Sequence, residues 1–525
     1  MQNHPNNKKF IRQIGIALFA ACVVGAALSA RPVPRAAAMQ AAAAPKPGVA
    51  YEIAPRFGKS PGVSVVMRFA VSPDADNVDV QMPIWSPGDY HIQDFAQYVQ
   101  NLRAWAGTPD DAHPLTVSRP DNNTWRIASD GAKSLTVTYD LPEMPPGYFS
   151  ENAQARPRQV FLNGPAVCLY PVGRKAEPAR LTFNLPSGWQ AECPLPFERR
   201  AAEQKIVYSA PDYDTLTDSP LLAAPQEDLR TLDFTLNGKP HRAVFFDQAK
   251  EISDVKIYQP VLTAIAQAES KIMSGAPYDR YEWFFDVGGR GGGLEHLNSS
   301  RLSLRASREP SRSADFIAHE FFHLWNVKRI RPAALGPFDY VHPPATRNLW
   351  FAEGVTEYYA HVATRRAGLR TEREIFDHWK AAIEAYQRNP ERLKISADDS
   401  SLRVWEADNS SGFGLSYYDK GELIGLCLDL KIRHVTGNRR SLDDVMRLLM
   451  ARCAPPKPGY GEDGIRDAVN EIAGTDLTDF YNLLARSTQE MPFAECLEYA
   501  GLDTNFAPLP SASAAQIALR KAWAR

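Results

Sequence analysis

The stretch Ala318-His319-Glu320-Phe321-Phe322-His323 contains the pattern His-Glu-x-x-His, and it constrains this 525-residue chain more tightly than any other segment. On an α-helix, positions i and i+4 lie on one face, about 6 Å apart along the axis, so His319 and His323 can converge on one metal ion. Glu320 projects beside such a metal, where its carboxylate can take a proton from water. The pattern therefore predicts a helix that carries a hydrolytic zinc site.

The residues around this motif also predict a helix, and a buried one. Ser311 or Ser313 can serve as the N-cap, because serine side chains accept hydrogen bonds from the first backbone amides of a helix. The apolar residues that follow nearly encircle the axis, and they are Phe316, Ile317, Phe321, Phe322, Leu324 and Trp325. A helix of this kind is buried on most sides, which keeps bulk water away from a metal site on it.

A second predicted helix supplies a candidate third ligand. The segment Leu349 to Tyr359 contains Glu353 and Glu357, four residues apart and therefore on one helical face. One carboxylate can bind the metal while the other orients a ligand histidine from behind. We take Glu353 as the third ligand, which gives a His2Glu site with an open position, and Glu357 as the orienting group. In the alternative, both carboxylates lie on a solvated helical face, but their apolar and aromatic neighbours argue against it.

A glycine-rich segment lies upstream of the motif. It runs from Asp286 to His296 after the strand-like run Tyr281 to Phe285, and it has five glycines in six residues. Glycines let a backbone approach a ligand closely. The Lys-Ser/Thr ending of a phosphate-binding P-loop is missing, so we expect either a close approach to a substrate or a flexible turn.

Three separated motifs together resemble a known family. They are Gly292-Gly293-Leu294-Glu295-His296, the run from His319 to Pro332, and Trp350-Phe351-Ala352-Glu353-Gly354, and they occur in this order. These three motifs, in this order, make the chain similar to the glycyl aminopeptidase family of zinc peptidases. The resemblance implies one zinc ion held by His319, His323 and Glu353, with Glu320 as the general base that activates water.

The resemblance extends to the larger, related group of gluzincin aminopeptidases. It implies that Glu295 holds the free amino group of the substrate and that Gly292 and Gly293 line the cleft. It also implies that Tyr418, in Tyr418-Asp419-Lys420-Gly421, donates a hydrogen bond to the oxyanion of the tetrahedral intermediate. The residue pattern alone favours a tyrosine that opens an apolar core helix over 417–435, and the order of the motifs reverses that preference.

The chain reads as an α+β multidomain protein. We expect an N-terminal all-β sandwich-like domain over 48–248, a thermolysin-like zinc catalytic domain over 249–400, a C-terminal helical domain over 401–506 and a tail over 507–525. Taken alone, the β region could also be a carbohydrate-binding sandwich. Only about two dozen residues follow Gly501, so we do not expect the PDZ domain that many members of the family carry.

The start of the chain predicts export. Lys8, Lys9 and Arg12 precede an apolar run of 17 residues over 14–30, which is typical of a secretory signal peptide over 1–30 followed by an Ala/Pro-rich flexible leader over 31–47. The protein is then periplasmic or secreted, and the alternative is a membrane anchor formed by an uncleaved segment.

Five cysteines remain beyond the signal peptide. In an oxidising compartment Cys168 with Cys193, and Cys453 with Cys496, are possible disulfides, while Cys427 in an apolar helix is expected to be free.

Peptides are the partners that these features predict. The formal net charge of −2 gives no argument for nucleic acid or for an anionic membrane surface. The favoured function is an aminopeptidase that cleaves after small first residues, glycine or alanine, as the resemblance implies. The alternatives are a zinc endopeptidase and a secreted, non-catalytic binding protein with a vestigial zinc site.

Overall fold

The computed structural model describes residues 48–524, apart from 108–112, 146, 148, 150–151, 203, 290–291, 308 and 408–410. The predicted signal peptide (1–30) and leader (31–47) lie outside the described residues. Within the described part of the chain, no helix combines the length and hydrophobicity that crossing a bilayer requires.

The N-terminal region is rich in β-sheet, as predicted. Its described residues form an eight-stranded sheet of order β14-β15-β12-β1-β2-β8-β4-β5 and two four-stranded sheets, β13-β16-β10-β9 and β11-β3-β7-β6. Alternation builds the large sheet: in β1, Val49, Tyr51 and Ile53 face the core while the residues between them are partly exposed. The strands are β1 (Val49–Arg56), β2 (Gly62–Ala70), β3 (Asn77–Gln81), β4 (Gln100–Ala106), β5 (His113–Leu115), β6 (Val117–Ser118), β7 (Thr124–Ala128), β8 (Ser134–Pro142), β9 (Gln154–Arg156), β10 (Gln159–Leu162), β11 (Tyr170–Pro171), β12 (Ala179–Asn184), β13 (Trp189–Glu192), β14 (Phe197–Ala202), β15 (Lys205–Ala210) and β16 (Leu221–Pro225).

Short helical turns connect these strands. They are η1 (Phe95–Tyr98), η3 (Gly164–Ala166), α1 (Tyr213–Thr217) and η4 (Gln226–Asp228).

A separate five-stranded sheet supports the predicted metal site. Its order is β17-β18-β19-β21-β20, with β18, β19 and β21 parallel and with β20 antiparallel at one edge. The strands are β17 (Leu229–Leu236), β18 (Lys239–Phe246), β19 (Tyr281–Val287), β20 (Gly293–His296) and β21 (Ser299–Leu304). The prediction assigned residues 229–246 to the N-terminal β domain, but their strands β17 and β18 belong to this sheet. Local alternation identifies a strand without naming its partner, which explains the difference.

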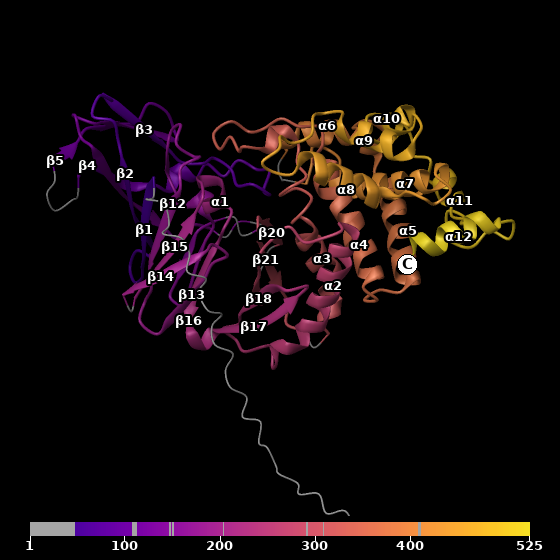
Figure 1. The fold of residues 1–525 in the computed structure, drawn as a ribbon, viewed down its shortest axis with the longest axis horizontal. Coiled ribbons are helices and arrows are strands. Elements are labelled where there is room, and N and C mark those ends of the chain that lie inside the picture. The colour runs from indigo at the N-terminus through magenta and orange to yellow at the C-terminus, as the bar shows by residue number, and fades with distance from the viewer. Residues whose placement is uncertain are drawn as a thin grey trace, which may run out of the picture. The chain divides into compact units, whose positions relative to one another are not determined.

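Helices pack against this sheet and against one another. The chain continues through η5 (Val255–Tyr258), α2 (Gln259–Ile272), η6 (Pro310–Ser313), α3 (Ala314–Phe322), η7 (Ala333–Leu335), the π-helix η8 (Trp350–Gly354), α4 (Val355–Arg366) and α5 (Glu372–Arg388). Helix α2 contacts β17, α3 and α4, and α3 contacts β20 and β21 (Figure 1). The sheet thereby holds α3, the predicted metal-binding helix, from one side.

The C-terminal region is helical, as predicted. It comprises η9 (Pro390–Leu393), α6 (Ala397–Leu402), η10 (Val404–Glu406), α7 (Tyr417–Val435), α8 (Leu442–Cys453), α9 (Gly464–Ala473), α10 (Thr478–Ala485), α11 (Phe493–Glu498) and α12 (Ala514–Trp523). The helix expected over 417–435 has those bounds in the structure.

The segment 507–525 is not merely a tail. It contains α12, whose Trp523 is 2% exposed and stacks on Trp379 with ring centroids 5.0 Å apart. The indole N–H of Trp523 also donates to the Tyr358 hydroxyl at 3.0 Å. The contacts of Trp523 with Trp379 and Tyr358 therefore pack α12 against the core.

The predicted disulfides are absent among the described cysteines, since Cys168, Cys193, Cys427, Cys453 and Cys496 are all free thiols and all buried. Cys496 lies beside Cys427, not beside Cys453. Burial and this neighbour raise the pKa of the Cys427 thiol well above its ordinary value. The predicted disulfide between Cys453 and Cys496 is therefore wrong, because the packing of α11 on α7 places Cys496 next to Cys427.

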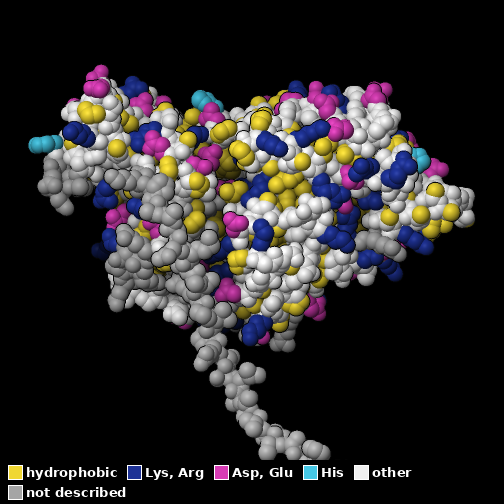
Figure 2. Space-filling model, viewed as in Figure 1, with side chains coloured by type: hydrophobic (Ala, Val, Ile, Leu, Met, Phe, Trp, Pro, Cys, Tyr) yellow, Lys and Arg dark blue, Asp and Glu magenta, His cyan; other side chains and the backbone are white. Residues whose placement is uncertain are grey.

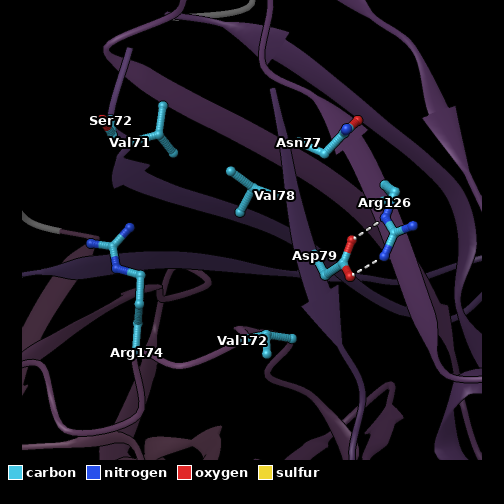
Figure 3. A pocket seen from close by; sticks show the side chains of 8 residues that line it. All are labelled: Val71, Ser72, Asn77, Val78, Asp79, Arg126, Val172 and Arg174. Atoms are coloured by element: carbon cyan, nitrogen blue, oxygen red, sulfur yellow. Dashed lines mark hydrogen bonds and ion pairs between the residues drawn. The ribbon is translucent and has the colours of Figure 1, made fainter. Parts of the chain in front are cut away.

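The surface shows mixed charge, and a broad hollow lies on the N-terminal region. Side chains of both signs are interspersed over the face in Figure 2. The hollow, of about 600 Å³, lies over β3 and β7 and contains the ion pair between Asp79 and Arg126, 2.8 Å apart (Figure 3). None of its eight lining residues is aromatic, so it lacks the rings on which a sugar would stack.

Candidate active site

Aromatic stacking fixes the metal-binding helix α3 in place. The Phe321 ring stacks on Trp283 of β19 with centroids 4.7 Å apart, and Phe322 stacks on Tyr359 of α4 at 4.5 Å. The helix begins after Ser313, as predicted, although the Ser313 side chain makes no capping hydrogen bond. It ends at Phe322, earlier than the apolar pattern suggests, because the amides of Leu324 and Trp325 bond to carbonyls three residues back. His323 at the C-cap keeps helical backbone angles, so its spacing from His319 is preserved.

The three predicted ligands come together. Nε2 of His319 and Nε2 of His323 are 3.0 Å apart. Oε2 of Glu353, from η8, lies 3.1 Å from Nε2 of His323 and 3.6 Å from Nε2 of His319. Ligands of a tetrahedral zinc ion, each about 2.0 to 2.1 Å from the metal, are separated by about 3.3 Å. All three side chains are buried, and their spacing fits such an ion.

The partners of the other imidazole nitrogens strengthen this fit. Nδ1 of His319 lies 2.7 Å from Oε2 of Glu357, and Nδ1 of His323 lies 2.6 Å from the backbone oxygen of Asn326. Carboxylate and carbonyl oxygens only accept hydrogen bonds, so each Nδ1 carries the proton that it donates. Both Nε2 atoms then present lone pairs to one another at short range, an arrangement that a cation between them stabilises. Glu357 thus lies where the sequence predicts an orienting group.

Asn326 connects the two ligand-bearing segments. Its backbone oxygen accepts from His323, while its side-chain amide donates to the backbone oxygen of Phe351 at 2.7 Å. Thr356 donates to the backbone oxygens of Asn326 and Ala352 at 3.1 and 2.7 Å. Phe351 and Ala352 belong to the π-helix η8, and π-helical turns are common at functional sites. Asn326 lies in the motif run from His319 to Pro332, but no sequence pattern assigned it a role of its own.

Glu320 is positioned to move a proton. It is 5% exposed, and its Oε2 has no hydrogen-bond partner among the described residues. Before any metal charge is counted, burial raises the pKa of Glu320 to about 7. Gly293 of β20 lies against this carboxylate, since a Cβ at Gly293 would be 2.2 Å from Oε1. The backbone of β20 therefore approaches the base as closely as only glycine allows. Gly292 lies just before β20 and is half-buried.

Glu295 lies on the edge strand β20 and is 3% exposed. It is near enough to the metal ligands that its charge contributes to raising the pKa of both Glu320 and His323. Lys328, which is also buried, places Nζ 3.5 Å from Oε1 of Glu295 and 3.1 Å from Oδ1 of Asp218. Sequence reasoning missed Lys328 and Asp218, because their contacts join distant parts of the chain.

Gly88 brings the N-terminal region into the site. Its φ is +96°, and a Cβ there would lie 2.6 Å from Oε2 of Glu295. The segment Met82 to Tyr90 therefore contacts the catalytic region through backbone, and no helical or strand period in the sequence predicts this contact.

Tyr418 is the first-turn residue of α7 that the resemblance singled out. Its ring stacks on His319 with centroids 6.1 Å apart. Burial, followed by the charge of Glu353, raises the pKa of the Tyr418 phenol well above its ordinary value, so the hydroxyl is a neutral donor. Tyr418 is thus a partly buried aromatic that packs against the core and lies beside His319, and its role toward an oxyanion stays a prediction.

Two glycines set the distance between η8 and α7. A Cβ at Gly354 would lie 2.4 Å from Cα of Gly421 and 2.7 Å from the backbone oxygen of Tyr418. The two backbones therefore touch directly. This contact places Glu353, on η8, against the start of the helix that carries Tyr418.

The fold and this histidine-glutamate set define a class of protein, the metallopeptidases. Residues 50–225 match the family model described as the peptidase M61 N-terminal domain, and residues 312–424 match the one described as M61 glycyl aminopeptidase. These matches together span more than half of the chain. The chain therefore belongs to the M61 glycyl aminopeptidase family, and it is a metallopeptidase of the aminopeptidase type.

Solved structures agree with this assignment. An aminopeptidase N family protein from Idiomarina loihiensis is 25% identical, with a TM-score of 0.78 over 86% of this chain and 78% of that one. An M1 zinc metallopeptidase from Deinococcus radiodurans is 11% identical and shares the fold, with a TM-score of 0.55 over 85% of this chain and 94% of that one. A variant of the latter bound to a Tyr-Ser-Ala substrate gives 11% identity and a TM-score of 0.53, with 85% and 94% coverage. A search of curated protein sequences finds no match.

Proposed function

We propose that this protein is a zinc-dependent aminopeptidase that hydrolyses the first peptide bond of peptides whose first residue is glycine or alanine. His319, His323 and Glu353 would hold one zinc ion per chain. The observation that carries the proposal is the buried carboxylate of Glu295, which lies on an edge strand beside this set. A carboxylate at that place can bind the ammonium group of a peptide and so restrict cleavage to its first bond.

Zinc, when bound, supplies Lewis acidity toward the scissile carbonyl and toward water. Glu320 accepts the proton of the attacking water at its free Oε2 and delivers it to the nitrogen of the leaving amine. Tyr418 donates its phenolic proton in a hydrogen bond to the oxygen that becomes negative. The phenol is suited to this role because it remains neutral and adds no charge of its own.

Lys328 contacts Glu295, the proposed anchor for the substrate ammonium group, and leaves its carboxylate able to bind that group. Its ammonium group is shared between Glu295 and Asp218, so one cation faces two carboxylates. Because Asp218 shares this cation, and is itself also contacted by Nδ1 of His296 at 3.1 Å, the Glu295 carboxylate can still accept hydrogen bonds from a substrate ammonium group. Lys328 also holds Glu295 in place, and we assign it a positioning role.

The preference for small first residues is supported by the match to the family model described as M61 glycyl aminopeptidase. A small cavity of about 10 Å³ lies next to Gly88 and Lys328 but is not lined by Glu295 or the metal ligands, so it is no argument for this preference.

Aminoacyl and peptide substrates test the proposal. We expect the zinc-loaded protein to release glycine and alanine faster than leucine or phenylalanine, to lose this activity with a chelator, and to reject N-acetylated peptides. Cleavage of N-acetylated peptides at internal bonds would instead establish the endopeptidase alternative.

The general base is tested separately. Glu320→Gln keeps the size and burial of the side chain but cannot take a proton. We expect zinc to remain bound while kcat falls by about 10²- to 10⁴-fold or more. Near-normal turnover in the zinc-replete variant would refute the role of Glu320.

We also propose that the protein is exported. The charged start and the apolar run over 14–30 support this proposal. Amino-terminal sequencing of protein from the periplasmic or culture fraction should find a start near residue 31 or 39. Full-length protein in the membrane fraction would favour the anchored alternative.

A further inference from the structure

A second cluster of metal-binding side chains lies behind the active site, where α4, α5 and α7 pack together (Figure 1). It consists of His361 on α4, His378 on α5 and Glu422 on α7, whose ligand atoms all lie within 4.8 Å of one another. Nε2 of His378 is 2.8 Å from Oε1 of Glu422, and Nε2 of His361 is 3.8 Å from the same oxygen. The centroids of the two imidazole rings lie 3.6 Å apart, and the ring planes are tilted by 34°.

The buried histidine of this cluster faces carboxylates without a hydrogen bond that satisfies it. The His361 side chain is 7% exposed, and its Nε2 has no hydrogen-bond partner among the described residues. Oε1 of Glu357 lies 3.3 Å from this nitrogen, and Oδ1 of Asp315 lies 3.6 Å from Nδ1. An interior nitrogen of this kind calls for an explanation, and a bound cation is one.

We propose that His361, His378 and Glu422, together with Glu357, form a second binding site for a divalent transition metal ion of the zinc class. Two imidazoles and two carboxylates are the ligands that zinc and its neighbours prefer, whereas magnesium and calcium prefer oxygen alone. The two carboxylates also balance the charge of a divalent ion.

Neighbouring groups hold these ligands in place. Trp379 donates its indole N–H to Oε1 of Glu422 at 3.0 Å, and Asp315 lies behind His361 as an outer carboxylate. The His378 side chain is 36% exposed, which gives an ion a route to the cluster. Without a metal, a proton on His361 can satisfy the same carboxylates, so metal binding must displace that proton.

Glu357 joins this cluster to the active site. One of its oxygens accepts from His319 at 2.7 Å, and the other faces His361 at 3.3 Å. A cation at the second site would draw charge from Glu357 and weaken the hydrogen bond that supports His319. We therefore expect occupancy of the second site to lower the zinc affinity of the first, and by linkage the reverse.

Metal stoichiometry of the full chain tests the proposal independently of catalysis. The protein is equilibrated with zinc by dialysis and its metal content measured by mass spectrometry. We expect two zinc ions in the native protein, and one in each of His323→Ala and His378→Ala. Glu422→Gln, which preserves shape, should also bind one. His342→Ala, at an exposed histidine on a loop, is the control and should bind two.

Cobalt absorption spectra separate the two sites. The absorption bands of cobalt at the second site should be lost in His378→Ala and retained in His323→Ala. One zinc ion in the native protein, or two in both folded His378→Ala and Glu422→Gln, would overturn the proposal. No metal in His323→Ala would overturn it as well. If His378→Ala binds no zinc, the proposed active-site metal is refuted instead, because the ion expected to remain in that variant is the one at His319, His323 and Glu353.

Discussion

The glycine contact between η8 and α7 gives a sharp test of how the site is positioned. Gly354→Ala would place a Cβ 2.4 Å from Cα of Gly421, whereas two carbon atoms in contact lie about 3.5 to 4.0 Å apart. The obstacle is backbone, so η8 and α7 must separate by roughly 1 Å or more. Overpacking of this kind costs about 1 to 3 kcal/mol of stability.

The larger effect of Gly354→Ala should be on chemistry. Glu353 is the preceding residue and Tyr418 lies one turn before Gly421, so the separation moves a metal ligand relative to the oxyanion donor. A misplacement of about 1 Å can cost about 10²-fold in rate. We expect zinc affinity to fall and kcat to fall about 10²-fold, while the protein remains folded.

The assay compares zinc affinity by chelator competition, kcat on an alanyl substrate, and Tm. Gly461→Ala is the matched control, because nothing lies within 4 Å of a Cβ at Gly461. A Gly354→Ala protein with the zinc affinity and kcat of Gly461→Ala would refute the idea that this contact sets the geometry of the site.

Three further predictions concern different links in the structure. Glu357→Gln should lower zinc affinity about 10- to 100-fold, measured by chelator competition. The reason is that an amide oxygen accepts the hydrogen bond from Nδ1 of His319 more weakly than a carboxylate does. Gly88→Ala should raise KM through displacement of Glu295, whereas Gly131→Ala, which shares the positive φ but meets nothing within 4 Å, should lose stability and keep its KM. Equal KM values in the two variants would contradict this contact. Trp523→Ala should destabilise the fold by about 3 to 5 kcal/mol in denaturant unfolding, and an unchanged midpoint would show that α12 is dispensable.

Much of the site follows from local spacing. The positions of His319 and His323 are set by the helical period, and the structure brings their Nε2 atoms within 3.0 Å. Glu353 and Glu357 are likewise one helical turn apart, although the first lies in a π-helix that no sequence pattern announced. Motif order placed Glu295 and Tyr418 near the same point without giving their distances.

The remainder depends on contacts between distant segments. Gly88, Lys328 and Asn326 act through partners far along the chain or through backbone oxygens, and periodicity carries no information about either. The same limit explains why residues 229–246 were predicted to belong to the N-terminal β domain, since a hydrophobic alternation identifies a strand but not its neighbour.

The hydrogen bonds of Asn326 and Thr356 have a consequence for the metal-free protein. The groups that orient His323 and connect it to the segment of Glu353 belong to the protein alone, and they are buried. Small zinc domains unfold without their ion because the ion is their core. Here the scaffold is complete beforehand, so removal of the ion should abolish reactivity and preserve shape. The metal-free protein should therefore recover its activity when zinc is added, without a refolding step.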